Sequence, residues 1–259
     1  MVKKILSIVL WAVTAIALVV LFAFGRRHYL ETPLQGIAFH IDRHLEKGFI
    51  DRDTEMRQFE SVCDLEHHTK ISGIDLMKIQ KLLNANPWVE TSSAYIGLND
   101  TLTVTVKEYE PVLRVFTQDK RSVYVTHEGI IFPSSPRYTP RTIIASGHYN
   151  FPAPLKGDRA TDSLYKDSGI KEALAIAEAL QQDPFLNGNV GQIYRNEKNE
   201  YELTVNNLQA RVLLGDTLQM ASKLSNLKVL LEKYSGTDEL SGYKTVDLQY
   251  KNQIVCTKQ

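Results

Sequence analysis

The longest apolar stretch of the chain lies near its N-terminal end. Residues 5–24 form twenty consecutive positions without a charged residue, proline or glycine. A helix of this length measures about 30 Å, close to the thickness of the hydrocarbon core of a bilayer. The pattern therefore predicts a transmembrane helix over residues 5–24, preceded by a short tail (1–4) and followed by a linker (25–33).

A cleaved signal peptide is the alternative interpretation of this stretch. The motif Ala23-Phe24-Gly25 fits a small-x-small cleavage site, but the apolar run exceeds the roughly 7–15 residues of a signal core. Because Arg26 and Arg27 follow at once, we favour an uncleaved anchor. Lysines and arginines flank both ends, so charge alone gives no orientation. A tail in the cytosol with the bulk of the chain outside is the arrangement we expect.

The next region, residues 34–108, alternates between strand and helix patterns. Its apolar positions recur at a spacing of two in three segments and at helical spacing in two others. Asp51 stands where the N-cap of the first helix is expected, and Ser72 and Asp75 both offer caps for the second. These patterns predict a small α+β unit with two helices packed on one sheet. In chain order the segments are a strand at 36–41, helices beginning after Asp51 and Asp75, and strands at 88–96 and 101–107.

Residues 109–259 contain many short alternating runs and two amphipathic helices. One helix carries apolar residues at 173–180 and stops before Pro184. The other begins after Asp216 or Thr217 and turns Leu224, Leu227 and Leu231 inward. The expected fold class is therefore α+β: a single N-terminal transmembrane helix, a small domain, and a sheet-rich β domain with two helices. The expected strands are 111–116, 122–125, 143–145, 192–196, 201–205, 210–214 and one final strand over 243–256.

Composition narrows the possible partners. Lys plus Arg and Asp plus Glu both total 30, and no long block of one sign occurs. This balance argues against a nucleic-acid partner. The two cysteines, Cys63 and Cys256, lie far apart in the sequence. They could form one disulfide in an oxidising compartment, but we favour two unpaired thiols.

The sequence lacks the motifs of the common enzyme classes. It contains no G-x-S-x-G, G-x-G-x-x-G, Walker or H-E-x-x-H pattern. The adjacent His67 and His68 would point about 100° apart on a helix and suit a shared metal poorly. The S-x-x-K pattern, as at Ser225 and Lys228, occurs without S-D-N or K-T-G. We therefore expect no enzymatic activity, no cofactor, no metal and no small-molecule substrate.

Several local motifs occur in a distinctive order behind the anchor. The most specific is L-L-N-A-N-P-W-V-E at 82–90, followed by the alternating L-T-V-T-V at 102–106. Glu108, Pro111 and Val112 then lead into a V-Y-V-T-H-E-G hairpin motif at 123–129. Taken together, these parts resemble the FtsQ/DivIB cell-division family. The chain departs from that family at Leu98-Asn99-Asp100, where an aromatic–Pro pair is usual, and at Thr126, where the hairpin usually carries an acid.

The resemblance implies an architecture and a role. The architecture is one anchor, a polypeptide-transport-associated (POTRA-like) domain over 34–108 and a β domain over 109–259. The role is a non-catalytic scaffold that links early to late division proteins at the septum. The implied location is the bacterial cytoplasmic (inner) membrane, with the N-terminus in the cytoplasm and the bulk of the chain in the periplasm. The implied partners are FtsB- and FtsL-like membrane proteins, with FtsK- and FtsW-like proteins as further candidates.

The final strand is the candidate partner-binding site. If it forms a sheet edge, its unpaired N–H and C=O groups can accept a strand from another protein. Tyr250 aligns by local context with an aromatic of the family's partner-binding strand, although it could instead pack within the sheet. The candidate residues are Thr245, Val246, Asp247, Leu248, Gln249, Tyr250, Lys251, Ile254 and Val255.

Other interpretations remain open at the level of the sequence. The strands at 37–41 and 88–96 could each provide a second edge for an upstream partner. A POTRA-containing envelope assembly or export factor is the main alternative function. Such proteins carry tandem POTRA units or a β-barrel, and this chain shows neither an internal repeat nor a series of barrel strands. An anchored envelope enzyme is a third class, disfavoured by the missing motifs.

Overall fold

The computed structural model describes residues 2–43, 47–63, 69–234, 239–240, 242–251 and 253–258, apart from the side chains of residues 2, 3, 62 and 63. Within it the chain divides into two compact units, Met1–Glu108 and Tyr109–Gln259. Both mix helices and strands, so the expected α+β class is confirmed. The adjacent histidines His67 and His68 lie outside the described residues, as does the Cys63 side chain.

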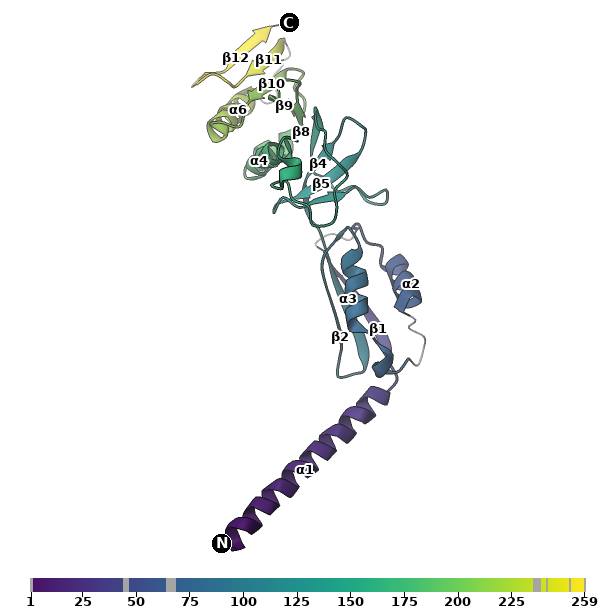
Figure 1. The fold of residues 1–259 in the computed structure, drawn as a ribbon. Coiled ribbons are helices and arrows are strands. Elements are labelled where there is room, and N and C mark those ends of the chain that lie inside the picture. Colours follow the sequence, from purple (N-terminus) through teal and green to yellow (C-terminus); the bar gives the residue numbers. More distant parts are fainter. Residues whose placement is uncertain are drawn as a thin grey trace. The chain divides into compact units, whose positions relative to one another are not determined.

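Helix α1 runs without interruption over Val2–Glu31 (Figure 1). Among the described residues it is the one helix long and apolar enough to cross a membrane. It continues beyond the expected end of the membrane span at Phe24, so most of the segment that we expected as a linker, residues 25–31, is helical. One glycine costs a helix only about 1 kcal/mol. The last turn is held by the Arg27–Glu31 ion pair, and Thr32 Oγ1 donates to the carbonyl oxygen of His28 at 3.1 Å.

The first unit then follows the expected order of strand, helix, helix, strand, strand. Its three-stranded sheet has the order β1-β3-β2, with β1 parallel and β2 antiparallel to the central β3. The core joins Phe39 of β1, Ile79 of α3 and Val104 of β3. The elements are β1 (Gly36–Asp42), α2 (Arg52–Cys63), the 3-10 helix η1 (Ile71–Gly73), α3 (Leu76–Ala85), β2 (Val89–Ile96) and β3 (Thr101–Glu108).

Aspartates cap both helices of this unit, and of the two candidates for α3 the cap is Asp75, since Ser72 lies in η1. The Asp51 carboxylate accepts a hydrogen bond from the Thr54 backbone N–H at 3.0 Å. The Asp75 carboxylate accepts one from the Lys78 backbone N–H at 3.0 Å. Each cap satisfies an N–H group that the first turn of a helix leaves without a partner. These contacts fix where α2 and α3 begin.

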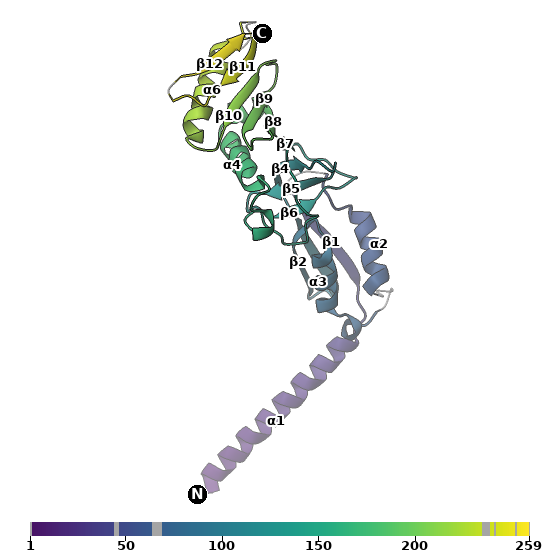
Figure 2. The same cartoon turned by 45° about the horizontal axis from the view of Figure 1, so that its top comes forward.

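The second unit is built on a nine-stranded sheet with the order β12-β11-β10-β9-β8-β7-β4-β5-β6. Helices α4 (Ile170–Gln181) and α6 (Met220–Tyr234) contribute to one hydrophobic core on this sheet (Figures 1 and 2). The buried face of α4 carries Ala173, Ile176 and Leu180, at helical spacing. The strands are β4 (Pro111–Phe116), β5 (Ser122–Thr126), β6 (Ile131–Pro133), β7 (Ile143–Gly147), β8 (Val190–Arg195), β9 (Tyr201–Val205), β10 (Arg211–Gly215), β11 (Tyr243–Asp247) and β12 (Val255–Lys258).

The second unit departs from the expected two helices. The described part of the unit contains a third α-helix, α5 (Pro184–Asn189), which follows α4. It also contains the 3-10 helix η2 (Ser163–Tyr165). Pro184 both ends the preceding pattern and occupies the first helical turn of α5, where its missing N–H costs nothing. The Asp183 carboxylate caps α5 by accepting from the Phe185 N–H at 2.9 Å.

The expected start of the last helix is also corrected. Helix α6 begins at Met220, because the preceding Gln219 has a φ of 52° and cannot belong to it. Asp216 instead accepts hydrogen bonds from the Leu218 N–H and the Lys223 ammonium group. Asp216 thus fixes the segment before α6 but is not the N-cap of the helix.

The expected single strand over 243–256 is wrong. The chain forms β11, turns, and returns as the antiparallel β12. The turn begins where the Leu248 N–H donates to the Leu213 carbonyl oxygen and the Gln249 N–H donates to the Asp247 carboxylate. A period-two pattern assigns residues to faces, and it cannot by itself distinguish one long strand from a hairpin.

Candidate functional site

The C-terminal hairpin places one strand at the edge of the large sheet. Strand β11 lies between β10 and β12 and pairs with both (Figure 2). Val246 lies opposite Val212 of β10 and Cys256 of β12. In the described sheet β12 has β11 as its one neighbour. The outer side of β12 is therefore the side on which an additional strand could pair.

Buried side chains hold the hairpin on the core. Val246 and Leu248 are fully buried within the second unit's hydrophobic core. Tyr243, Ile254 and Cys256 pack against the same core and are partly buried. Burial raises the pKa of the Cys256 thiol, which is not part of a disulfide. These contacts fix the position of the edge strand before any partner arrives.

The turn of the hairpin is exposed and carries an aromatic ring. Tyr250 is 52% exposed and lies between the two strands. Its expected place on the final strand is wrong, and its exposure also rules out the alternative that it packs within the sheet. Gln249 lies close above Gly215, whose φ of 73° is one that glycine adopts readily.

The nine candidate residues thus separate into three groups. Thr245, Val246 and Asp247 belong to β11, which is already paired on both sides. Leu248, Gln249, Tyr250, Lys251 and Ile254 lie between the strands, and Val255 begins β12. Sequence reasoning missed Cys256, Thr257 and Lys258, which complete the edge strand. The two β-branched residues of the segment Val255-Cys256-Thr257 were the signal that could have identified them.

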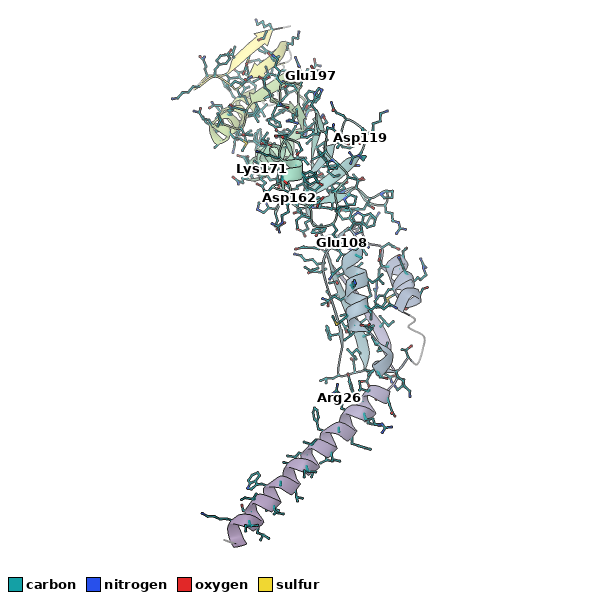
Figure 3. All side chains as sticks on the ribbon, in the orientation of Figure 1. Arg26, Glu108, Asp119, Asp162, Lys171 and Glu197 are labelled. Atoms are coloured by element: carbon teal, nitrogen blue, oxygen red, sulfur yellow. The ribbon has the colours of Figure 1, made fainter. Side chains whose placement is uncertain are left out.

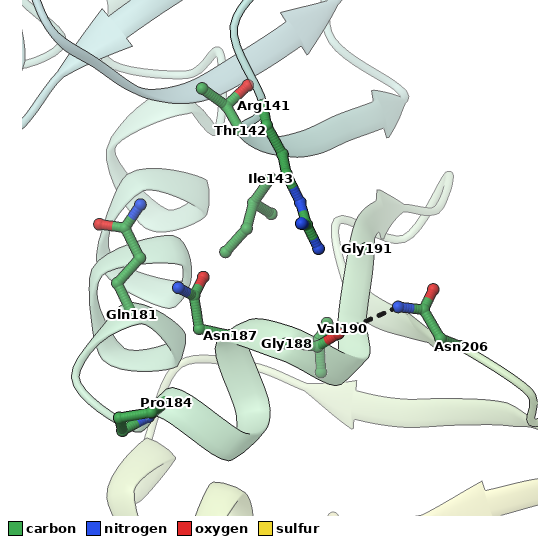
Figure 4. Close-up of a pocket in the computed structure, with 10 residues that line it drawn as sticks. All are labelled: Arg141, Thr142, Ile143, Gln181, Pro184, Asn187, Gly188, Val190, Gly191 and Asn206. Atoms are coloured by element: carbon green, nitrogen blue, oxygen red, sulfur yellow. Dashed lines mark hydrogen bonds between the residues drawn. The ribbon is translucent and has the colours of Figure 1, made fainter. Parts of the chain in front are cut away.

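A separate pocket of about 420 Å³ opens where β7 and β8 begin (Figure 4). Its lining contains no carboxylate, imidazole or thiol, so it offers no general acid–base pair. Figure 4 shows Arg141 on one side and Gln181 and Asn187 on the other. The lining residues are Arg141, Thr142, Ile143, Gln181, Pro184, Asn187, Gly188, Val190, Gly191 and Asn206.

Arg195 is a buried charged residue of the second unit, and its contacts hold the fold together. The guanidinium of Arg195 donates to the carbonyl oxygens of His148 at 2.6 Å and Ser168 at 3.0 Å. It also lies 5.7 Å from the ring centre of Tyr149. Burial raises the pKa of the neighbouring Tyr201 to about 12. Arg195 therefore fastens two loops to β8.

No group of three or more His, Cys, Asp or Glu side chains is arranged to hold a metal ion in the part of the chain that the structure describes. The C-terminal hairpin provides one edge of the large sheet. A model of the family described as FtsQ/DivIB, C-terminal related, matches residues 110–257, more than half of the chain. The chain belongs to this FtsQ/DivIB-related family. No curated protein matches it.

Membership in the FtsQ/DivIB-related family assigns a role in cell division and implies protein partners. FtsQ/DivIB proteins are non-enzymatic division proteins. The matched range begins one residue before β4 and ends within β12, so it includes all of the C-terminal hairpin except Lys258. Together with the apolar helix α1, family membership fits a single-pass membrane protein.

Proposed function

We propose that this FtsQ/DivIB-type protein is a non-catalytic scaffold of the division apparatus that binds FtsB- and FtsL-like proteins through β12. The observation that supports this most directly is that β12 lies at the edge of the large sheet. The family match extends into this strand, as far as Thr257. Backbone groups on its outer side would pair with a strand of the partner.

The length of β12 limits what main-chain pairing can contribute. The strand has four residues, so an added strand can form only a few backbone hydrogen bonds. Each contributes about 1 kcal/mol net, which is modest against the entropy lost on association. Side chains near the edge must therefore supply much of the affinity. Tyr250 and Val255 are exposed there, and aromatic residues are favoured anchors of interfaces.

The buried base of the hairpin favours binding in a second way. Val246 and Leu248 hold β11 on the core, so the edge strand does not have to become ordered when the partner binds. A preorganised site avoids part of the entropic cost of association. Membrane anchoring through α1 would add to this effect, because two proteins confined to one membrane meet at a high effective concentration.

The first unit would provide a second binding surface. We propose that it is a POTRA-like domain, on the basis of its strand-helix-helix-strand-strand order. The sheet order β1-β3-β2 leaves two edges for an upstream partner of the FtsK or FtsW type. In this proposal Met1 to Lys4 lie in the cytoplasm, both units lie outside the cytoplasmic membrane, and the protein is enriched at the septum.

A site-specific crosslinking experiment tests the main proposal. A photoreactive residue replaces Lys258 on the edge strand or, as the matched control, the exposed Thr204 on the internal strand β9. Cells then express the full-length chain together with its candidate FtsB- and FtsL-like partners. We expect a crosslinked partner from position 258 and none from 204. Equal crosslinking from both positions, or none from 258, would refute binding at this edge.

A further inference from the structure

We propose that the first unit docks onto the surface of the membrane through the turn between β2 and β3, with Leu98 at its tip. The surface consists of Tyr29, Met77, Tyr95 and Leu98, and its partner is the lipid headgroup layer next to α1. This inference rests on the proposed anchoring of α1 in a membrane. It adds a second contact between the protein and the bilayer.

Exposed apolar and aromatic side chains gather at one end of the first unit. Outside the apolar run of α1, these four are the large apolar or aromatic residues exposed in the described part of the first unit. Leu98 is fully exposed, and Met77 is 82% exposed. Scattered single residues of this kind are common on protein surfaces. Here, however, all four lie at the end of the unit where α1 joins it.

Backbone hydrogen bonds place the β2–β3 turn at that end. The Gln35 N–H donates to the Asp100 carbonyl oxygen at 2.9 Å. One residue later the parallel pairing of β1 with β3 begins, with Gly36 opposite Thr101. Because β1 leads away from α1, the turn that precedes β3 points back toward the helix. Leu98 occupies this turn, and Tyr95 is one residue from the end of β2.

The start of α3 lies at the same end. The Ile71 N–H in η1 donates to the Thr32 carbonyl oxygen at 3.0 Å, and the Leu34 N–H donates to the Thr69 carbonyl oxygen at 2.9 Å. Helix α3 begins three residues after η1, so Met77 in its first turn stays close to the end of α1. Figure 1 shows the β2–β3 turn and the start of α3 at the end of the small sheet where β1 begins.

The length of α1 sets the depth of this surface. Glu31 lies seven helical positions after Phe24, a rise of about 10 Å above the hydrocarbon core. The headgroup layer extends about 5–8 Å beyond that core on each side. A leucine or tyrosine reaching back from the turn would therefore meet the headgroups without entering the core. Tyrosine is enriched at this depth.

The charges around the surface suit the same partner. Arg26, labelled in Figure 3, and Lys70 and Lys78 are exposed at this end of the unit. Basic residues near a membrane surface are attracted to anionic headgroups. Three acids lie nearby: Glu31 pairs with Arg27, Asp75 caps α3, and the half-buried Asp100 lies in the turn itself. Exposed apolar and basic groups at headgroup depth favour a lipid surface over a second protein.

Depth-dependent fluorescence quenching tests the proposal on the full-length chain. The chain, with Cys63→Ser and Cys256→Ser, is placed in nanodiscs of phosphatidylethanolamine and phosphatidylglycerol. Single cysteines at Leu98, at Ala85 or at Val13 carry a fluorescent probe. Ala85 is the matched control, because it is exposed at the opposite end of α3. We expect headgroup-labelled lipid to quench the probe at 98 at least twofold more strongly than the probe at 85.

The probe at Val13 distinguishes a failure of membrane anchoring from a failure of docking. Quenching at 13 by lipid labelled in mid-chain reports that α1 is anchored. If position 13 is quenched while positions 98 and 85 give equal signals, docking is refuted and anchoring stands. If position 13 is not quenched, anchoring fails and docking fails with it.

Discussion

The carboxylate of Glu108 accepts a 2.9 Å hydrogen bond from the backbone N–H of Phe49, joining the end of β3 to the segment before α2. Its other oxygen accepts from the Ile50 N–H at 3.1 Å and forms an ion pair with Arg43. Glu108, which is labelled in Figure 3, is buried. A buried charge is stable only when it is paired and hydrogen-bonded in this way.

Replacing Glu108 with alanine should therefore destabilise the first unit by about 3 kcal/mol, because two buried N–H groups lose their acceptor. Urea denaturation of the full-length protein in detergent measures the change. The control is Glu90→Ala, which removes a more exposed ion pair with Lys107 and should cost less than about 1 kcal/mol. Equal effects of the two substitutions would show that Glu108 does not hold this segment.

A glycine next to this contact offers an independent test. A Cβ built on Gly48 would overlap both carboxylate oxygens of Glu108. Gly48→Ala should therefore displace the carboxylate and cost about 2 kcal/mol. Gly188 has open space at the same position, so Gly188→Ala should be neutral or slightly stabilising. Thermal unfolding of the two variants provides the comparison.

The buried Arg195 should be the most sensitive charged residue of the second unit. Arg195→Met keeps the length of the side chain but leaves the carbonyl oxygens of His148 and Ser168 without their donor. We expect a loss of about 3 kcal/mol in the free energy of unfolding. Arg211→Met, which removes an exposed pair with Glu202, should change it by less than about 1 kcal/mol. A small effect at position 195 would contradict the fastening role.

The acid stability of the second unit should depend on Asp183. The Lys228 ammonium group donates to its carboxylate at 2.8 Å, and this bond lowers the pKa of Asp183 below its usual value of 3.8. A group with a depressed folded-state pKa stabilises the fold above its unfolded pKa and loses that contribution as the pH falls through the folded value. Between about pH 5 and 2, Asp183→Asn should therefore lose less thermal stability than the unmodified chain. Parallel curves would contradict this role.

The exposed Tyr250 should contribute to partner binding without supporting the fold. Tyr250→Ala removes a half-exposed ring from the hairpin turn, so the melting temperature should stay within about 2 °C of the original. Its affinity for an FtsB-like partner should fall roughly tenfold, as for an aromatic interface anchor. Val229→Ala, exposed on α6, is the matched control. Calorimetric titration would refute the assignment if both variants bound equally well.

The parts of the fold that were predictable from sequence are those with local causes. Helices α2 and α3 start at the aspartates that cap them, and the 98–100 turn connects two clearly alternating strands. Such features depend on contacts within a few residues. The extension of α1 past Gly25 was missed because the apolar run ends where the membrane core ends, whereas helical hydrogen bonding does not.

The missed features depend on contacts between distant segments. The turn after β11 is fixed by the Leu213 carbonyl oxygen, which the sequence does not place near Leu248. Likewise, β7 lies between β4 and β8, and no local pattern determines that order. The expected binding site is misplaced for the same reason, because a hairpin stands where one strand was expected. Tyr250 was assigned to a strand by alternation, while the residues that form the edge, such as Thr257, come after the turn.

The central position of β3 also constrains how the first unit folds. Its sheet cannot form until β3 has been synthesised, because both β1 and β2 pair with it. Gly36 must find Thr101 across most of the unit, and distant pairings of this kind slow folding. Until then β1 stays unpaired next to the anchor, with its backbone groups open to other strands. A ribosome stalled before Thr101 would thus leave an aggregation-prone segment, whereas one stalled after Glu108 would leave a unit able to close.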